Sequence, residues 1–198
     1  MSEAFDGLRF AVIDVEGNGQ QPPEIIEIAI QAVDGLSVAT EPYVWLVKPE
    51  RSIAPIVTRK VHGIRNADVA DAPTWAEIAP DVAAALAGRI PVAHNARVEY
   101  DILRRQMPGW APTVVLDTLR LARALWPDLG TYSLDPLLDR AGILLGDEPG
   151  QRHRAGFDVH ATALLFIALA RVAGGQDEFF SAATLPGLAP PGNQESLW

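Results

Sequence analysis

Residues 9–19 read RFAVIDVEGNG, an apolar run that ends in two carboxylates, Asp14 and Glu16. The run predicts a buried strand. Alternate residues of a strand share a face, so the two carboxylates should lie side by side at its end. Burial and mutual repulsion both disfavour neighbouring charged carboxylates. The pair is therefore either a solvated turn or a place where a positive group binds.

The strand predicted at residues 8–16 is followed by apolar runs at 24–33 and 42–49. Their short connections predict an antiparallel meander. Two more strands are predicted at 89–94 and 112–118, each leading into a helix. Helices are expected at residues 72–88, 96–107, 119–126, 131–143 and 156–173, with a short one ending near Gly63. A meander followed by β–α units predicts an α/β fold with a five-stranded mixed sheet flanked by helices.

The chain has 198 residues, of which 48% are hydrophobic, enough for one substantial core. We expect a single domain over residues 1–180. The sequence then becomes rich in Pro and Gly, which predicts an extended tail over residues 181–198.

The formal net charge is −9, so the chain as a whole does not attract a polyanion. A nucleic-acid partner would have to be contacted locally, with bound cations cancelling part of the charge. Cysteine is absent, which excludes disulfides, thiolate zinc sites and a cysteine nucleophile. The N-terminus lacks the pattern of a secretory signal, and the longest apolar stretch, residues 161–173, is short for a membrane span. We therefore expect a cytoplasmic protein that does not enter a membrane.

Further polar residues lie at the ends of predicted strands and helices. His94, Asn95 and Glu99 lie at the end of the strand at 89–94 and the start of the following helix, while His153 and Asp158 lie at the entrance to the last helix. Sites in open α/β sheets lie beyond strand ends, so these side chains should converge. Converging carboxylates require cations, and hard oxygen ligands favour Mg²⁺ or Mn²⁺ over Zn²⁺.

Three motifs occur in order: DVEGNG at residues 14–19, HNARVE at 94–99 and HRAGFD at 153–158. Together with the linking segments VHGI, LDTLRLARALWP and YSLDPLLDRAGI, they resemble the DEDDh (DnaQ-like) family of 3′→5′ exonucleases over residues 8–173. LVKPERSIAP and ARALWP look most similar to the exonuclease X branch.

This resemblance implies an RNase H-like fold and hydrolysis of phosphodiester bonds with two Mg²⁺ or Mn²⁺ ions. It implies that Asp14, Glu16, Glu99 and Asp158 hold the metals and that His153 is the general base. Glu99 stands where the family has Asp, and its extra methylene moves the carboxylate about 1.5 Å further out. In a related subclass of the family, a catalytic Tyr stands four residues before the last Asp. This chain has Arg154 at that position, so the histidine subclass is indicated.

The resemblance also points to residues that would contact the substrate. Gly17 and Asn18 replace the usual Thr-Thr beside the terminal nucleotide; Gly17 permits close approach, and Asn18 offers a hydrogen bond. His62 is expected either in the nucleotide pocket or as a structural loop residue. Asn95 is a second substrate-binding candidate, although with His94 it could equally order the junction between strand and helix.

The last five residues, QESLW, resemble the short peptides with which bacterial replication and repair proteins dock on the sliding clamp. Gln194, Leu197 and Trp198 would be the anchors, presented by the flexible leader. The alternative is a tail without a partner, or one folded against the domain.

The sequence thus predicts a metal-dependent 3′→5′ exonuclease that releases nucleoside monophosphates from DNA 3′ ends, single-stranded or frayed, in repair, proofreading or end trimming. One alternative is a non-catalytic module that binds nucleic-acid ends, because Glu99 has replaced the usual Asp. Another is an exonuclease that acts on RNA.

Overall fold

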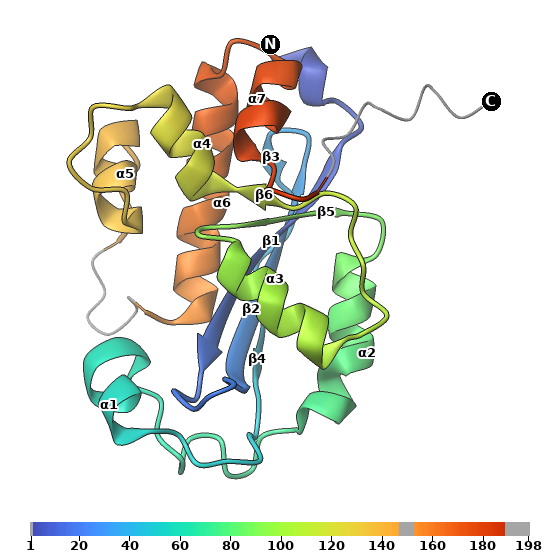
Figure 1. Cartoon of the computed structure of the whole chain (residues 1–198), viewed down its shortest axis with the longest axis vertical. Helices are drawn as coiled ribbons and strands as arrows, with labels where there is room; N and C mark the ends of the chain where they lie inside the picture. Colours follow the sequence, from blue (N-terminus) through green and yellow to red (C-terminus); the bar gives the residue numbers. More distant parts are fainter. Residues whose placement is uncertain (1, 147–152, 189–198) are drawn as a thin grey trace.

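A computed structural model describes residues 2–146 and 153–188 of the chain (Figure 1). Its mixed sheet has the order β3-β2-β1-β5-β6, and β4 also pairs with β2. β1 runs antiparallel to β2 and parallel to β5. The strands are β1 (Arg9–Gly17), β2 (Ile25–Asp34), β3 (Ser37–Val38), β4 (Tyr43–Leu46), β5 (Ile90–Ala93) and β6 (Leu116–Asp117). The predicted mixed sheet is confirmed, but the two-residue β3 was not predicted and brings the sheet to six strands.

The predicted helices are present, with ends displaced by a few residues. α2 begins after a capping box in which the backbone N–H of Thr74 donates to Glu77 at 2.7 Å. Gly63, at a φ of 74°, ends the short helical segment as expected. The helices are α1 (Pro55–Val57), the π-helical turn η2 (Thr58–His62), α2 (Trp75–Leu86), α3 (Arg97–Gln106), α4 (Thr118–Leu125), α5 (Leu134–Ala141), α6 (Ala155–Val172) and α7 (Gln176–Ala183), besides a 3₁₀ turn, η1 (Ser2–Phe5).

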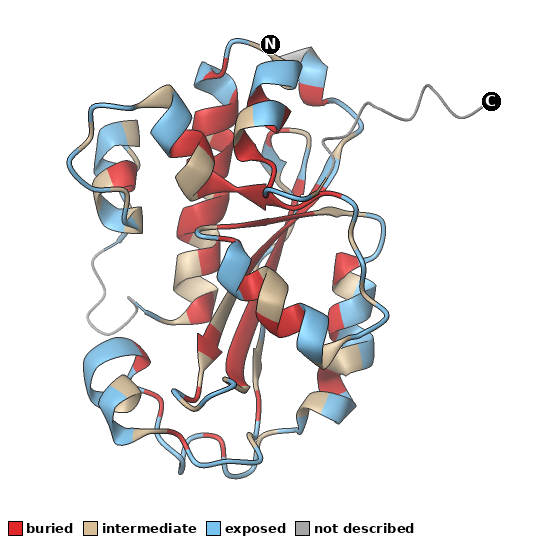
Figure 2. Cartoon of the chain, in the orientation of Figure 1, coloured by how far each residue is buried: buried red, intermediate tan, exposed pale blue. Residues whose placement is uncertain are grey.

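Alternation along β1 divides the core between the two faces of the sheet. Phe10 and Val12 pack with residues of α4 to α7 in one cluster. Ala11 and Ile13 pack with residues of α2 and α3 in another. Figure 2 shows that the central strands and most of α6 are buried, whereas α1 is largely exposed. The sheet is therefore a central layer covered by helices on both faces.

Helix α6 is long and apolar enough to cross a membrane by length and composition. In the fold, 56% of its 18 residues are buried, and it packs against β1, β2, α4 and α5. Its apolar character is therefore explained by its place in the core.

The C-terminal part of the described chain differs from the expected tail. The boundary expected after residue 180 falls inside α7, a helix that was not predicted. Beyond it, the buried Leu185 donates its backbone N–H to the carbonyl of Val115 at 2.9 Å. The chain thus continues to pack on the domain past residue 180, and residues 189–198 lie outside the described part.

The aromatic packing at the centre of the α6 layer generates a stability prediction. Phe166 is fully buried and contacts Phe10 and Phe179, with ring centroids 4.8 and 5.6 Å away. We expect Phe166→Ala to lower the free energy of unfolding by about 3–5 kcal/mol, measured by urea denaturation. Val172→Ala, at an exposed position of the same helix, is the matched control and should change it by less than about 0.5 kcal/mol. Equal effects of the two variants would contradict this description of the core.

Candidate active site

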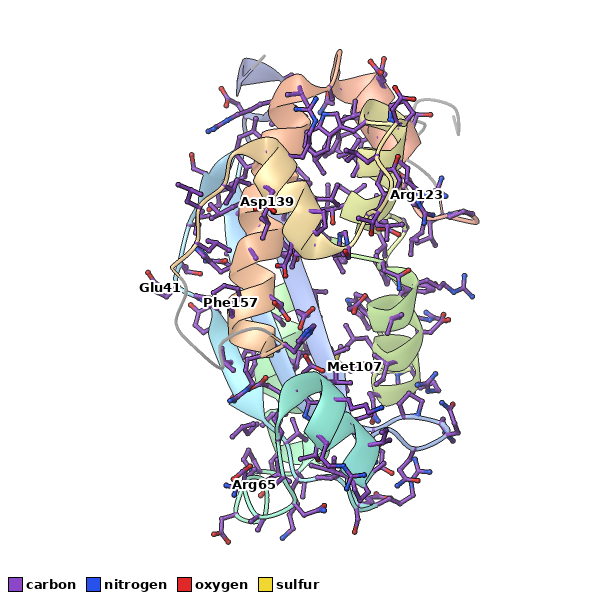
Figure 3. The ribbon with its side chains drawn as sticks, turned by 90° about the vertical axis from the view of Figure 1, so that its left-hand side faces the viewer. Glu41, Arg65, Met107, Arg123, Asp139 and Phe157 are labelled. Atoms are coloured by element: carbon purple, nitrogen blue, oxygen red, sulfur yellow. The ribbon has the colours of Figure 1, made fainter. Side chains whose placement is uncertain are left out.

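Three carboxylates from distant parts of the sequence meet at the end of β1. Asp14 and Glu16 lie on β1, and Asp158 lies in the first turn of α6. A ligand oxygen from each lies within 4.8 Å of the others. Figure 3 shows the end of the central sheet between α6, α3 and α1, with Phe157 labelled on the first turn of α6. We call Asp14, Glu16 and Asp158 the carboxylate cluster.

The local sequence explains this convergence. Asp14 and Glu16 continue the alternation of Phe10 and Val12, so they face the α6 side of the sheet. The register between β1 and β2 shifts between Glu16 and Gly17, a bulge that ends regular pairing at the site. The predicted adjacency of Asp14 and Glu16 is therefore present, and α6 adds the third carboxylate.

The cluster is electrostatically unfavourable without a positive partner. Burial, followed by the charges of Glu99, Asp158 and Glu16, holds the pKa of Asp14 well above its usual value. Burial and the charge of Asp158 raise the pKa of Glu16 to about 8. The Glu16 carboxyl group would therefore hold a proton near neutral pH unless a cation replaced that proton.

Glu99 lies beside the cluster but is not part of the group of oxygens within 4.8 Å. It occupies the first turn of α3 and is 7% exposed, and its Oε2 has no hydrogen-bond partner among the described residues. Burial raises its pKa to about 8. Asp101 does not substitute for it, because that carboxylate pairs with Arg97 at 2.8 Å on the surface of α3.

These residues fit a divalent metal site. Oxygen ligands from carboxylates suit Mg²⁺, Mn²⁺ and related hard cations. The buried, unpartnered Oε2 of Glu99 offers a further oxygen next to the cluster. A cation would also relieve the repulsion that raises these pKa values.

His153 lies just before α6, five residues before Asp158. Its side chain is exposed, and its backbone adopts a φ of 60°, in the left-handed region. A residue other than glycine holds such a conformation only where its surroundings impose it. Its role as general base stays a prediction.

Asn18 has a structural role in addition to the predicted substrate contact. Its side chain is fully buried, and its Oδ1 accepts backbone N–H groups of Gln20 and Glu24 at 3.1 and 3.0 Å. Its Nδ2 donates to the carbonyl of Arg51 at 3.3 Å. These contacts engage the amide in closing the loop, while a contact of Asn18 with the substrate stays a prediction. Gly17 is half-buried at the bulge.

His62 and Asn95 lie on two other segments, the η2 turn and the turn before α3. His62 is buried, accepts the backbone N–H of Ile64 through Nδ1 at 3.0 Å, and has no described partner for Nε2. Burial lowers its pKa. Asn95 is exposed at a φ of 66°, and its N–H donates to Asp117 at 3.0 Å. Both keep the structural roles weighed for them, while their contacts with substrate stay predictions.

Two residues beside the cluster were not predicted as functional. Glu27 pairs with Glu16 across the strands and is 1% exposed, and Arg154 contacts it through two nitrogens. The available signal was a carboxylate in the middle of the apolar run EIIEIAIQAV, since charged residues are seldom fully buried without a partner. Gln194, Leu197 and Trp198 lie outside the described residues, so clamp binding stays a prediction.

A carboxylate cluster at the end of a central strand defines a class of α/β proteins suited to metal-assisted hydrolysis. Residues 11–166 match the model of the exonuclease family, RNase_T. Exodeoxyribonuclease 10 of Escherichia coli is 35% identical over 166 residues, covering 82% of this chain and 69% of that protein. The chain belongs to this exonuclease family, a family of hydrolases that normally use divalent metal ions.

Solved structures and longer relatives agree with this assignment. Exonuclease X in complex with 5′ overhanging duplex DNA has a TM-score of 0.71 and 33% identity, covering 87% of this chain and 96% of that one. The fold is therefore RNase H-like, as predicted. A DNA polymerase III subunit epsilon-like protein of Rhodobacter capsulatus is 38% identical over 83% of this chain, but the chain spans only 24% of that relative.

The buried Glu99 predicts a pH-dependent stability in metal-free protein. Its folded pKa of about 8 exceeds the ordinary value of 4.5, so the protonated form stabilises the fold below pH 4.5, and this contribution is lost as the pH rises through 8. In chelator, the melting temperature of the wild type should fall between pH 5 and 8.5. Glu99→Gln should raise it at pH 8.5 by about 5 °C or more and change it little at pH 5.

The control is Glu50→Gln, at an exposed carboxylate. We expect this variant to melt like the wild type at both pH values. If Glu99→Gln and wild type showed the same fall, the buried carboxyl would not carry this dependence.

The contacts of Asn18 predict a loop-closing role. Asn18→Ala leaves two backbone N–H groups without an acceptor, so we expect a loss of about 1–3 kcal/mol in the free energy of unfolding by urea. Gln20→Ala is the control, because its side chain donates one exposed hydrogen bond to Ser52 and its loss should cost less than about 1 kcal/mol. A loss no larger than that of the control would contradict this role.

Proposed function

We propose that the protein is a DEDDh-type 3′→5′ exonuclease that hydrolyses DNA 3′ ends with two Mg²⁺ or Mn²⁺ ions. The observation that carries this proposal is the convergence of Asp14, Glu16 and Asp158 within 4.8 Å, beside the buried Glu99. Family membership and the DNA complex of the similar exonuclease X support it.

In this proposal Asp14, Glu16, Glu99 and Asp158 hold the ions, which neutralise the carboxylates and stabilise the negative charge that develops on the phosphate. His153 accepts a proton at a ring nitrogen from the attacking water. Its exposed position before α6 leaves the ring accessible to water and substrate.

The substrate is proposed to be a single-stranded or frayed DNA end. The net charge of −9 disfavours broad contact with a duplex, whereas gripping one chain end needs only a local site. A cytoplasmic location, and work in repair, proofreading or end trimming, belong to the same proposal. The non-catalytic alternative rests on Glu99, whose carboxylate lies outside the 4.8 Å group.

A 5′-labelled oligonucleotide tests this function. With Mg²⁺ or Mn²⁺, we expect the wild type to shorten single-stranded DNA into a ladder of 5′-labelled products, as removal from the 3′ end requires. Asp14→Asn should reduce the rate by about 10³-fold or more, because it removes one carboxylate charge from the cluster. Asp101→Asn, on the outer surface of α3, should keep the wild-type rate.

Parallel assays with DNA and RNA substrates show which polymer the enzyme shortens.

Binding without shortening under both metals would contradict an exonuclease and support the end-binding alternative. Gain of shortening by Glu99→Asp would then identify the extra methylene as the cause.

A further inference from the structure

Glu27 and Arg154 form an ion pair next to the carboxylate cluster. Glu27, on β2, lies opposite Glu16 of β1. The Nε of Arg154 lies 3.1 Å from both carboxylate oxygens of Glu27, and its Nη2 also donates to Oε1. Two donating nitrogens fix the plane of the guanidinium, which a single ammonium group would not do.

The same carboxylate holds the start of α6. The backbone N–H of Ala155 donates to Oε2 of Glu27 at 2.8 Å. One buried side chain on β2 thus fixes two consecutive residues, Arg154 through its side chain and Ala155 through its backbone. These residues follow His153 directly.

This attachment affects the position of His153 more than the position of Asp158. Asp158 lies within α6, whose buried residues anchor the helix in the core. His153 lies before the helix, is exposed, and has a left-handed φ of 60°. A strained backbone conformation persists where neighbouring contacts impose it, and Arg154 and Ala155 supply such contacts.

The ion pair also affects the charge of the site. Glu27 adds a carboxylate beside the cluster and raises the pKa of both Asp14 and Glu16. Arg154 acts in the opposite direction on Glu16. Pairing with Arg154 therefore allows Glu27 to anchor α6 without adding its full negative charge to the cluster.

We propose that Glu27 and Arg154 are positioning residues, whose ion pair ties the start of α6 to β2 and thereby orients His153 toward the carboxylate cluster. The role of His153 as proton acceptor rests on the proposed function. The attachment of residues 154 and 155 to Glu27 does not depend on the proposed function.

The kinetic test uses Glu27→Gln, Arg154→Lys, Arg154→Gln and the double variant Glu27→Gln/Arg154→Gln. We expect each single variant to lower kcat by about tenfold or more, with KM changed by less than about threefold, because orientation rather than binding is lost. The kcat of the double variant should lie within about threefold of the lower kcat of its two single variants, Glu27→Gln and Arg154→Gln. The two effects should not add, because both substitutions break the same contact. For Arg154→Lys, which keeps the charge beside the carboxylate cluster, the Kd for Mn²⁺ measured by calorimetry should stay within about threefold, because Asp14 and Glu16 do not move.

The control is Asp34→Asn, which breaks an ion pair with Arg89 (2.6 Å) at a more exposed carboxylate elsewhere on the sheet. It should leave kcat unchanged. Melting temperatures are compared for every variant, and kinetics are measured well below the lowest of them. Arg154→Lys keeps the charge, so it reports on orientation even if Arg154→Gln folds poorly.

A second readout does not depend on activity. In Glu27→Gln, the amide proton of Ala155 should exchange with solvent faster, and the ring resonances of His153 should shift, as followed by NMR; Asp34→Asn should change neither. Unchanged kcat and unchanged Ala155 exchange would overturn the proposal, as would a parallel loss of kcat, Mn²⁺ binding and melting temperature. If the wild type shortened no substrate, the proposed function would fail, and the NMR measurements would still decide the positioning.

Discussion

The rest of the site depends on one electrostatic constraint, the repulsion among carboxylates that the fold gathers at the end of β1. Asp14, Glu16 and Asp158 are close enough to share one ion, and burial removes much of the water that would otherwise screen them. The structure does not separate them, because each is attached to an element that the core holds. The packing energy of the domain thus maintains an arrangement that charge alone would disperse.

The elements that hold these residues are largely buried. β1 is packed on both faces, and α6 has ten buried residues along its length. The segments that close the site are held by polar contacts instead. Asn18 holds the loop between β1 and β2, and Glu27 holds the start of α6. Apolar burial therefore places the cluster, and buried hydrogen bonds refine the segments that enter it.

Much of this could be predicted from the sequence, because strand alternation is a local property. Strand alternation predicted that Asp14 and Glu16 lie together, and the order and spacing of the motifs indicated Asp158 as a further member of the site. β3 could not be predicted, since two residues carry no periodic signal, and the Pro and Gly content near residue 184 concealed α7. The loop contacts of Asn18 with Gln20, Glu24 and Arg51 could not be predicted, because only the folded chain determines the positions of these residues.

Glu99 shows why residue type alone does not settle the site. Its longer side chain remains buried on α3, with one oxygen unpartnered and a pKa raised to about 8. Without a cation, the group is therefore mostly protonated at pH 7. A cation that bound beside it would favour the charged form and release a proton, so occupancy and ionisation are linked. Replacement of Asp by Glu at this position thus keeps a potential ligand while making its charge depend on the metal.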